Sequence, residues 1–205
     1  MVFIDLAGYS ALVDAHGDQT AVDVADSLLR ITTEQLIGRG DLIKTIGDAV
    51  MLGFTTPMEA LHTVAGILAE LDRTPQLPWP STGMHHGPVM ERSGDLFGRR
   101  VNIAARLAGI AGPGEVLCTQ PVAVAAAAAG IEPTERGALR LRNISDPIPA
   151  FALPLLTAAP VPVDPVCRMR VTETAYVLVH NDRQWRFCSA ACADRFLARP
   201  DDFAN

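Results

Sequence analysis

Two stretches near the start of the chain, FIDLAGYSAL at residues 3–12 and KTIGDAVMLGF at residues 44–54, carry the fold prediction. The first stretch continues an apolar run that reaches Asp5 and then small residues, which predicts a strand within 1–6 that turns into a helix. In the second, Gly47-Asp48 predicts a hairpin turn between two strands within 41–54. Asp5 and Asp48 are therefore both expected at strand ends.

Helices and strands are expected to alternate along the rest of the first 155 residues, which is typical of an α/β or α+β domain with a mixed sheet and flanking helices. Apolar residues at helical spacing predict helices at 20–37, 57–71, 100–110 and 121–129. Further strands are expected at 83–90, 115–119 and, on either side of Asp146-Pro147, within 139–153.

A proline-containing segment separates this domain from a second, smaller unit. We expect a domain at 1–155, a linker at 156–163 and a cysteine-rich unit at 164–205. The small unit is expected to contain a hairpin around Asn181-Asp182 and a helix at 190–198.

Composition limits the functions to be considered. The chain of 205 residues has 49% apolar and 20% charged residues, as globular proteins do, and its net charge of −6 argues against general binding to nucleic acid or to anionic membranes. No apolar run approaches the roughly 20 residues that span a bilayer, and no secretory leader is recognisable, so we expect a cytoplasmic protein.

The aspartates at the two strand ends suggest phosphoryl chemistry. A pair of neighbouring carboxylates can hold two divalent cations, which stabilise the attacking and leaving oxygens of a phosphoryl displacement. Oxygen ligands favour Mg²⁺ or Mn²⁺. Each aspartate alone is more often a helix cap or a turn residue, so the prediction depends on the surrounding pattern.

That pattern continues with GMHHGPV at 83–89 and GDLFGRRVNIAARL at 94–107, in which Asn102 and Arg106 share one helix face. Together with the first two stretches, these segments resemble the catalytic domain of class III adenylate and guanylate cyclases over about residues 1–155. Six positions fall at the spacing and in the order of that family: Asp5, Lys44, Asp48, Asp95, Asn102 and Arg106.

The resemblance implies a ferredoxin-like cyclase domain that converts ATP to 3′,5′-cyclic AMP and pyrophosphate. By this resemblance Asp5 and Asp48, with the Leu6 carbonyl, would hold two Mg²⁺ or Mn²⁺ ions. Asn102 would position the ribose, and the permanently charged Arg106 would stabilise the transferring α-phosphate. Backbone N–H groups around Ala7 to Ser10, those of Gly8, Tyr9 and Ser10 among them, lie at a helix start and would bind the β- and γ-phosphates.

By the same resemblance, Lys44 and Asp95 would recognise the base. Adenine presents an acceptor at N1 to Lys44 and a donor at N6 to Asp95, whereas guanine presents the opposite groups. Each buried group left unpaired costs about 1–3 kcal/mol, so ATP is favoured and guanylate cyclase is the alternative.

In the family the site forms between two catalytic domains arranged head to tail. This chain carries both halves once, which implies a homodimer with two sites. A second alternative is a non-enzymatic metal sensor or carrier that keeps a cyclase-like dimerisation scaffold. Only four residues precede Asp5, fewer than usual in the family, so we expect either a short first strand or a natural start that lies further upstream.

The second unit contains Cys167, Cys188 and Cys192, whose clustering indicates metal ligands more than disulfides in a reducing compartment. The segments DPVCRM at 164–169 and FCSAAC at 187–192 resemble the YHS/TRASH family of small metal-binding domains. Copper or zinc would fit, with His180, Met169 or water as the fourth ligand, and we expect the metal to modulate the cyclase. The alternative is a set of structural thiols.

Three further residues are expected to be structural. Cys118 lies on a predicted strand and is expected to be a buried thiol. His85 and His86 lie in a glycine-flanked strand and are read as structural. In the YHS/TRASH family a glycine often stands where this chain has Arg168.

Overall fold

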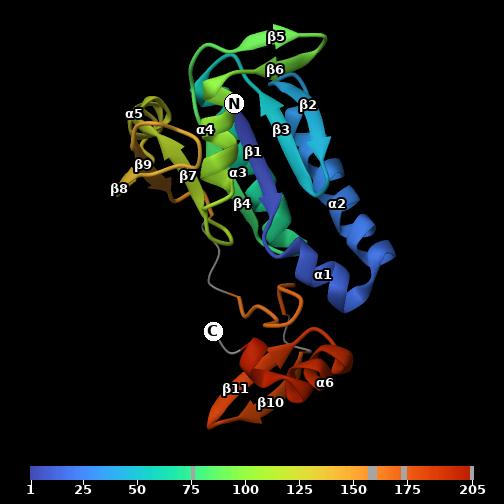
Figure 1. Cartoon of the computed structure of the whole chain (residues 1–205). Helices are drawn as coiled ribbons and strands as arrows, with labels where there is room; N and C mark the ends of the chain where they lie inside the picture. The colour runs from blue at the N-terminus through green and yellow to red at the C-terminus, as the bar shows by residue number, and fades with distance from the viewer. Residues whose placement is uncertain (75–76, 157–160, 172–174, 204–205) are drawn as a thin grey trace.

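The computed structural model describes residues 1–74, 77–156, 161–171 and 175–203. The first unit is built on a seven-stranded sheet with the order β2-β3-β1-β4-β7-β9-β8 (Figure 1). Neighbouring strands are antiparallel except for β4 and β7, which are parallel. The strands are β1 (Val2–Leu6), β2 (Asp41–Ile46), β3 (Ala49–Gly53), β4 (Pro80–Met84), β7 (Val116–Thr119), β8 (Thr134–Leu139) and β9 (Ile148–Leu153).

Helices cover both faces of this sheet (Figure 1). The helices α2 and α3 pack together and α3 packs on α5, whereas α4 lies against β4, β1 and β7. The mixed α+β fold predicted from the sequence is confirmed. The helices of the first unit are α1 (Tyr9–His16), α2 (Asp18–Leu36), α3 (Pro57–Arg73), α4 (Arg99–Ala108) and α5 (Gln120–Ala128).

The central strand β1 shows how the sequence pattern produces the two layers. Side chains alternate between the faces of a strand. Val2, Ile4 and Leu6 are buried in the large apolar cluster with α2 and α3, while Phe3 is buried with Met51 in the cluster of α4. The same alternation places Asp5 on the face of Phe3, which is the α4 face.

Two strand predictions were misplaced. The strand expected at 83–90 lies at Pro80–Met84, and the chain then leaves the sheet to form the separate hairpin of β5 (Met90–Arg92) and β6 (Asp95–Phe97). The strand expected to begin at Leu139 instead ends there, because β8 pairs with β9 from Thr134 through an irregularity at Gly137, whose φ is +78°. No helix in the described part of the chain combines the length and apolar character needed to cross a membrane.

The second unit lies beyond α1 (Figure 1). It contains the hairpin β10 (Tyr176–His180) and β11 (Arg183–Phe187), the helix α6 (Ala190–Ala198) and a 3₁₀ turn at Pro200–Asp202. Asn181 and Asp182 both have positive φ, as a two-residue hairpin turn requires. The hairpin and the helix were both predicted at these positions. Phe187 and Phe196 are fully buried and form the centre of this small core.

Candidate active site and cysteine cluster

The structure brings Asp5 and Asp48 together beside the end of β1. Antiparallel pairing of Ile4 with Val50 places the β2–β3 turn next to Leu6, and Gly47 takes the positive φ of +62° in that turn. The two carboxyl groups share a hydrogen bond, and the backbone N–H of Leu6 donates to both. The arrangement is that of two half-buried acids in contact.

Burial and mutual repulsion oppose full ionisation of this pair. Burial and, second to it, the neighbouring negative charge of Asp5 together raise the pKa of Asp48 to about 6. Burial also raises the pKa of Asp5, against the lowering effect of its hydrogen bond with Asp48. A pair of close carboxylates is relieved by a cation, and their oxygens are the ligands that Mg²⁺ and Mn²⁺ prefer, so the donor set fits these ions.

The turn after β1 leads directly into α1. Gly8 has φ of +82° and precedes Tyr9, so the N–H groups at the start of α1 lie at an uncapped helix end. The N–H of Ala7 is already used, since it donates to the Trp79 carbonyl at 3.1 Å. The groups that remain for an anion are therefore those of Gly8, Tyr9 and Ser10.

Lys44 and Asp95 form an ion pair, with 2.5 Å between Nζ and Oδ2. A register shift in β2 between Leu42 and Lys44 marks a bulge, which changes the direction of the strand where Lys44 projects. The lysine holds the pKa of the Asp95 carboxyl below its usual value, and the Leu96 N–H donates to the second oxygen at 2.8 Å. Both side chains stay partly exposed, at 39% and 29%, so they remain accessible to a ligand.

Asn102 and Arg106 lie on the exposed side of α4, one turn apart. The opposite side of α4 rests on β4 at Gly83, where a Cβ would lie 2.1 Å from the Ala104 carbonyl oxygen. Among the described residues, no hydrogen bond links either side chain to the Asp5–Asp48 pair. Within one chain, the predicted site residues therefore lie in separate groups.

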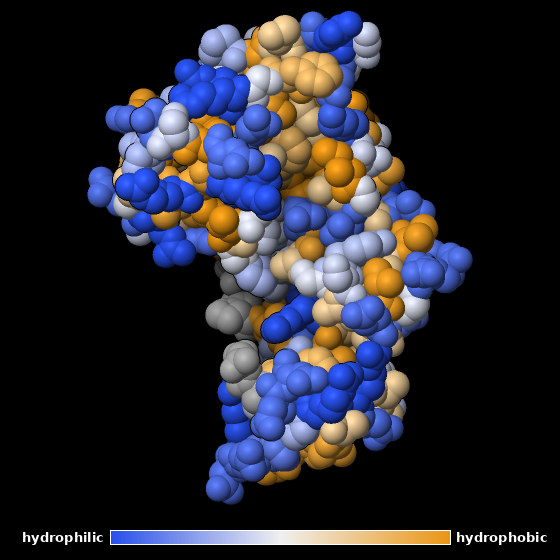
Figure 2. Space-filling view, viewed as in Figure 1, coloured by the Kyte–Doolittle hydropathy of each residue, from blue (hydrophilic) through white to orange (hydrophobic). Residues whose placement is uncertain are grey.

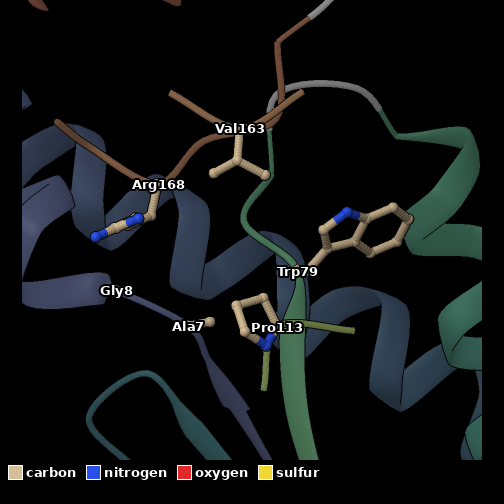
Figure 3. A pocket seen from close by; sticks show the side chains of 6 residues that line it. All are labelled: Ala7, Gly8, Trp79, Pro113, Val163 and Arg168. Atoms are coloured by element: carbon tan, nitrogen blue, oxygen red, sulfur yellow. The ribbon is translucent and has the colours of Figure 1, made fainter. Parts of the chain in front are cut away.

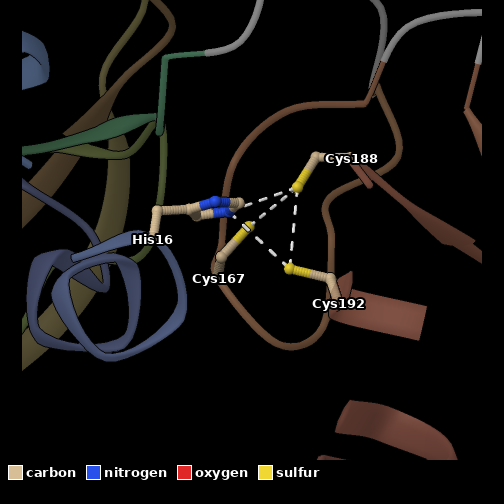
Figure 4. A group of neighbouring side chains, drawn as sticks. All are labelled: His16, Cys167, Cys188 and Cys192. Atoms are coloured by element: carbon tan, nitrogen blue, oxygen red, sulfur yellow. Dashed lines mark hydrogen bonds between the residues drawn. The ribbon is translucent and has the colours of Figure 1, made fainter. Parts of the chain in front are cut away.

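The three cysteines of the second unit converge with a histidine of the first (Figure 4). Cys188 Sγ lies 3.5 Å from Cys167 Sγ and 3.7 Å from Cys192 Sγ, while His16 Nε2 lies 3.4 Å from Cys188 Sγ and 3.6 Å from Cys192 Sγ. All four ligand atoms lie within 4.8 Å of one another.

His16 occupies the fourth position that sequence reasoning left to His180, Met169 or water. His180 instead packs edge-on against Phe196, with 5.6 Å between ring centroids. Nothing in the sequence near His16 marks it as a ligand, because its partners lie more than 150 residues away. Only the tertiary structure brings them together.

Asp164 holds the cysteine loops in place. This fully buried carboxylate accepts from Val166 N at 2.8 Å and Cys167 N at 3.3 Å through one oxygen, and from Cys188 N at 2.7 Å through the other. Both loops are therefore positioned by one side chain.

Of the three residues expected to be structural, Cys118 and His85 are buried and His86 is exposed. Cys118 is fully buried in β7, and burial raises the pKa of its thiol to about 12, so it is the predicted core thiol. His85 is buried, with Nδ1 2.7 Å from Thr119 Oγ1, in keeping with a structural role. His86 is exposed, so it contributes nothing to the core.

Comparison with known proteins agrees with this geometry. The chain is 32% identical over 155 residues to a pH-sensitive adenylate cyclase of Mycobacterium tuberculosis, covering 74% of this chain and 39% of the relative. It is 32% identical over 116 residues to an adenylate cyclase of Glutamicibacter nicotianae, covering 56% and 29%. The chain thus spans well under half the length of these relatives.

Solved structures show the same fold. The adenylyl cyclase CyaB of P. aeruginosa matches with a TM-score of 0.62 at 18% identity, over 74% of this chain and 91% of that one. A monomeric adenylate cyclase of Trypanosoma brucei matches with a TM-score of 0.65 at 19% identity, over 78% and 90%.

Family models cover nearly the whole chain. The model of the YHS domain matches residues 163–205, which contain the three clustered cysteines. The model of the adenylate and guanylate cyclase catalytic domain matches residues 1–153, which contain both aspartates, the Lys44–Asp95 pair and α4. The chain therefore belongs to the adenylate and guanylate cyclase catalytic domain family and carries a YHS domain at its C-terminal side.

Proposed function

We propose that this protein is an adenylate cyclase that converts ATP to 3′,5′-cyclic AMP and pyrophosphate at the interface of a homodimer. The observation that carries the proposal is the contact between Asp5 and Asp48 beside the N-terminus of α1. Two carboxylates meet there next to free backbone N–H groups, which is an environment for cations and a triphosphate. The relatives named adenylate cyclase support the same activity.

The substrate is held by groups with separate roles. Asp5 and Asp48, with the Leu6 carbonyl, hold two Mg²⁺ or Mn²⁺ ions, which stabilise negative charge on the reacting oxygens when bound. The N–H groups of Gly8, Tyr9 and Ser10 bind the β- and γ-phosphates. The ribose 3′-hydroxyl attacks the α-phosphorus in line, and pyrophosphate leaves.

The Lys44–Asp95 pair supports ATP as the substrate. The Lys44 ammonium can donate to adenine N1, and the Asp95 carboxylate can accept from the N6 amine. On guanine the ammonium would face a donor and the carboxylate would face an acceptor. The ion pair seen here has to open or shift to admit the base, and adenine replaces the contact that each partner loses.

Head-to-tail dimerisation is supported by what the surface exposes. Asn102, which positions the ribose, and Arg106, which stabilises the α-phosphate, both point to solvent from α4. Apolar side chains are also exposed on β2 and on the β5–β6 hairpin: Leu42, Ile46, Met90 and Phe97. The hairpin lies at the top of the molecule in Figure 1, where Figure 2 shows hydrophobic side chains at the surface. A second chain packed over these side chains would cover them and bring its own Asn102 and Arg106 to the aspartates.

The cysteine cluster adds a metal to this scheme. Three thiolates suit Zn²⁺ or Cu⁺. We assign a metal of this class to Cys167, Cys188 and Cys192, and its binding modulates the cyclase. Competition between Zn²⁺ and Cu⁺ for the purified chain, measured by metal analysis after dialysis, identifies the ion.

The activity is tested with purified protein, ATP and Mn²⁺, with Asp48→Ala as the inactive control and GTP assayed in parallel. We expect cyclic AMP from the wild type alone, and at least about tenfold lower turnover with GTP. Production of no cyclic AMP above the control would refute the enzymatic proposal and favour a metal sensor on a cyclase scaffold. Equal turnover of GTP would refute the role of Lys44 and Asp95.

A further inference from the structure

The cysteine cluster is shared between the two units of the chain. Three ligand atoms come from the YHS domain, and the fourth, His16 Nε2, comes from the last residue of α1 in the cyclase domain. We propose that a metal ion bound by Cys167, Cys188, Cys192 and His16 ties the YHS domain to α1 and thereby fixes the Gly8 turn of the active site.

The distances fit a tetrahedral ion. Bonds of about 2.3 Å to sulfur and 2.0–2.1 Å to nitrogen at tetrahedral angles separate two sulfurs by about 3.8 Å and a sulfur from a nitrogen by about 3.6 Å. Four of the six separations are 3.5 and 3.7 Å between sulfurs and 3.4 and 3.6 Å between sulfur and nitrogen, and the other two are within 4.8 Å. A disulfide would need about 2.05 Å between sulfurs, so the cluster is spaced for an ion and not for a covalent bond.

Hydrogen bonding alone gives little reason for this convergence. Thiols are weak donors and weak acceptors, yet three of them meet one imidazole at a half-buried to buried position. The carboxylate of Asp164 fixes the backbone of both cysteine loops, which orients the thiols before any ion arrives. Such a preformed set of soft ligands is what a structural metal site needs.

The opposite end of α1 also touches the YHS domain (Figure 3). Arg168, next to the ligand Cys167, lies over Gly8, where a Cβ would come 2.4 Å from Arg168 Cγ. Arg168 has φ of +63°, a conformation that costs a residue with a side chain about 1–2 kcal/mol and that explains the glycine often found at this position in the family. This chain keeps a side chain there, and that side chain covers the turn proposed to bind phosphate.

The metal is expected to restrain α1, and it is not needed to hold the YHS domain against the cyclase domain. Arg170 anchors the YHS domain independently, because its guanidinium donates to the Leu71 and Thr74 carbonyls at the end of α3 and stacks on Trp79 at 4.0 Å. Between this anchor and the Gly8 turn lies a cavity of about 380 Å³ lined by Ala7, Gly8, Trp79, Pro113, Val163 and Arg168 (Figure 3). The junction is therefore incompletely packed beside the turn, and the metal and Arg168 restrain α1 from its two ends.

The test uses the full chain, stripped of metal under reducing conditions and titrated with Co²⁺ or Zn²⁺. We expect one ion per chain and the visible absorption of tetrahedral thiolate-bound Co²⁺. His16→Ala should weaken binding by about tenfold or more and alter the absorption, since even outer-shell partners of a metal change affinity 10–100-fold. His180→Ala and His62→Ala, the latter exposed on α3, should bind as the wild type does.

Hydrogen exchange gives a second readout that needs no enzymatic activity. Metal should slow amide exchange in α1 of the wild type by about tenfold and leave α5 unchanged, and it should have no such effect on α1 in His16→Ala. Alanine favours helix, so the variant keeps α1. Unchanged affinity and absorption in His16→Ala, loss of binding in His180→Ala instead, or no protection of α1 would each overturn the shared site.

The consequence for catalysis rests on the proposed cyclase activity. Zinc should lower the KM for ATP by about twofold or more in the wild type but not in His16→Ala, because only the wild type fixes the Gly8 turn. A chain that binds metal through His16 yet makes no cyclic AMP would refute the proposed function alone. An active cyclase whose KM ignores zinc would refute the link between the metal and the turn.

Discussion

Replacing Asp48 by asparagine should stabilise the metal-free protein while removing a proposed metal ligand. The fold holds Asp48 against Asp5, and burial raises the pKa of Asp48 to about 6 from 3.8. Because the folded-state pKa lies above the unfolded one, the ionised carboxylate destabilises the fold. Stability contributed by the protonated form is complete below about pH 4 and is lost as the pH rises through about 6.

The size of the effect follows from the shift. About two pKa units at 1.36 kcal/mol each correspond to about 3 kcal/mol for a fully desolvated group. Asp48 is only half-buried, so solvent screening reduces this figure to about 1–1.5 kcal/mol. Asp48→Asn should therefore be more stable than the wild type by about this amount at pH 8 and nearly equal to it at pH 4.

The assay is chemical denaturation of both proteins at pH 4, 6 and 8 in buffer free of Mg²⁺ and Mn²⁺, with Asp41→Asn at the exposed start of β2 as the control. Adding Mg²⁺ at pH 8 should stabilise the wild type and leave Asp48→Asn unchanged. An Asp48→Asn variant no more stable than the wild type at pH 8 would show that the two carboxylates do not repel each other in the fold.

Three other changes test the dimer, the packing of α4 and the junction. A 1:1 mixture of Asp48→Ala and Arg106→Ala chains, each inactive alone, should recover about one quarter of wild-type activity, because half of the dimers contain one intact site. Gly83→Ala pushes α4 off β4, since the new Cβ would meet backbone at 2.1 Å, and should lower stability by about 1–3 kcal/mol and reduce kcat. Arg170→Met leaves carbonyls at the end of α3 unpaired and should lower the free energy of unfolding by about 3 kcal/mol.

Each of these has a matched control or a contrary outcome. No recovery of activity in the mixture would place all site residues on one chain. Gly109→Ala, with its nearest neighbour at 3.6 Å, should be tolerated, and equal damage there would argue against a specific clash at Gly83. Arg183→Met, on the exposed hairpin, should change stability by less than about 0.5 kcal/mol, and a similar loss there would argue against a special anchor at Arg170.

Local patterns predicted most of the fold. The helix at 190–198 and the hairpin around Asn181-Asp182 were placed correctly, because caps and turns are determined by a few adjacent residues: Ser189 accepts from Cys192 N, and both turn residues take positive φ. The strand predicted at 83–90 was placed too late, because proline usually interrupts a strand, whereas Pro80 is the first residue of β4, a place where proline is tolerated. Pairing with β1 overrides that local preference.

In the candidate site, too, contacts between residues far apart in the sequence were harder to predict than local structure. The meeting of Asp5 with Asp48 was expected, but it depends on the pairing of β1 with β3, which no short hairpin connects. The Lys44–Asp95 ion pair joins residues 51 positions apart, and spacing alone gave their order but not their contact. His16 could not be predicted, because an isolated histidine at a helix end carries no local signal of its partners.

The ligand set of the cysteine cluster has a consequence for the order in which the chain matures. His16 and Cys188 are separated by 172 positions, so the two cannot meet until the cyclase domain has folded and the C-terminal segment has been synthesised. The proposed metal ion can therefore gain its full coordination only after the chain has been synthesised beyond Cys192 and the cyclase domain has folded. Molecules with all four ligands assembled would bind the ion tightly, whereas truncated or misfolded molecules would bind it weakly.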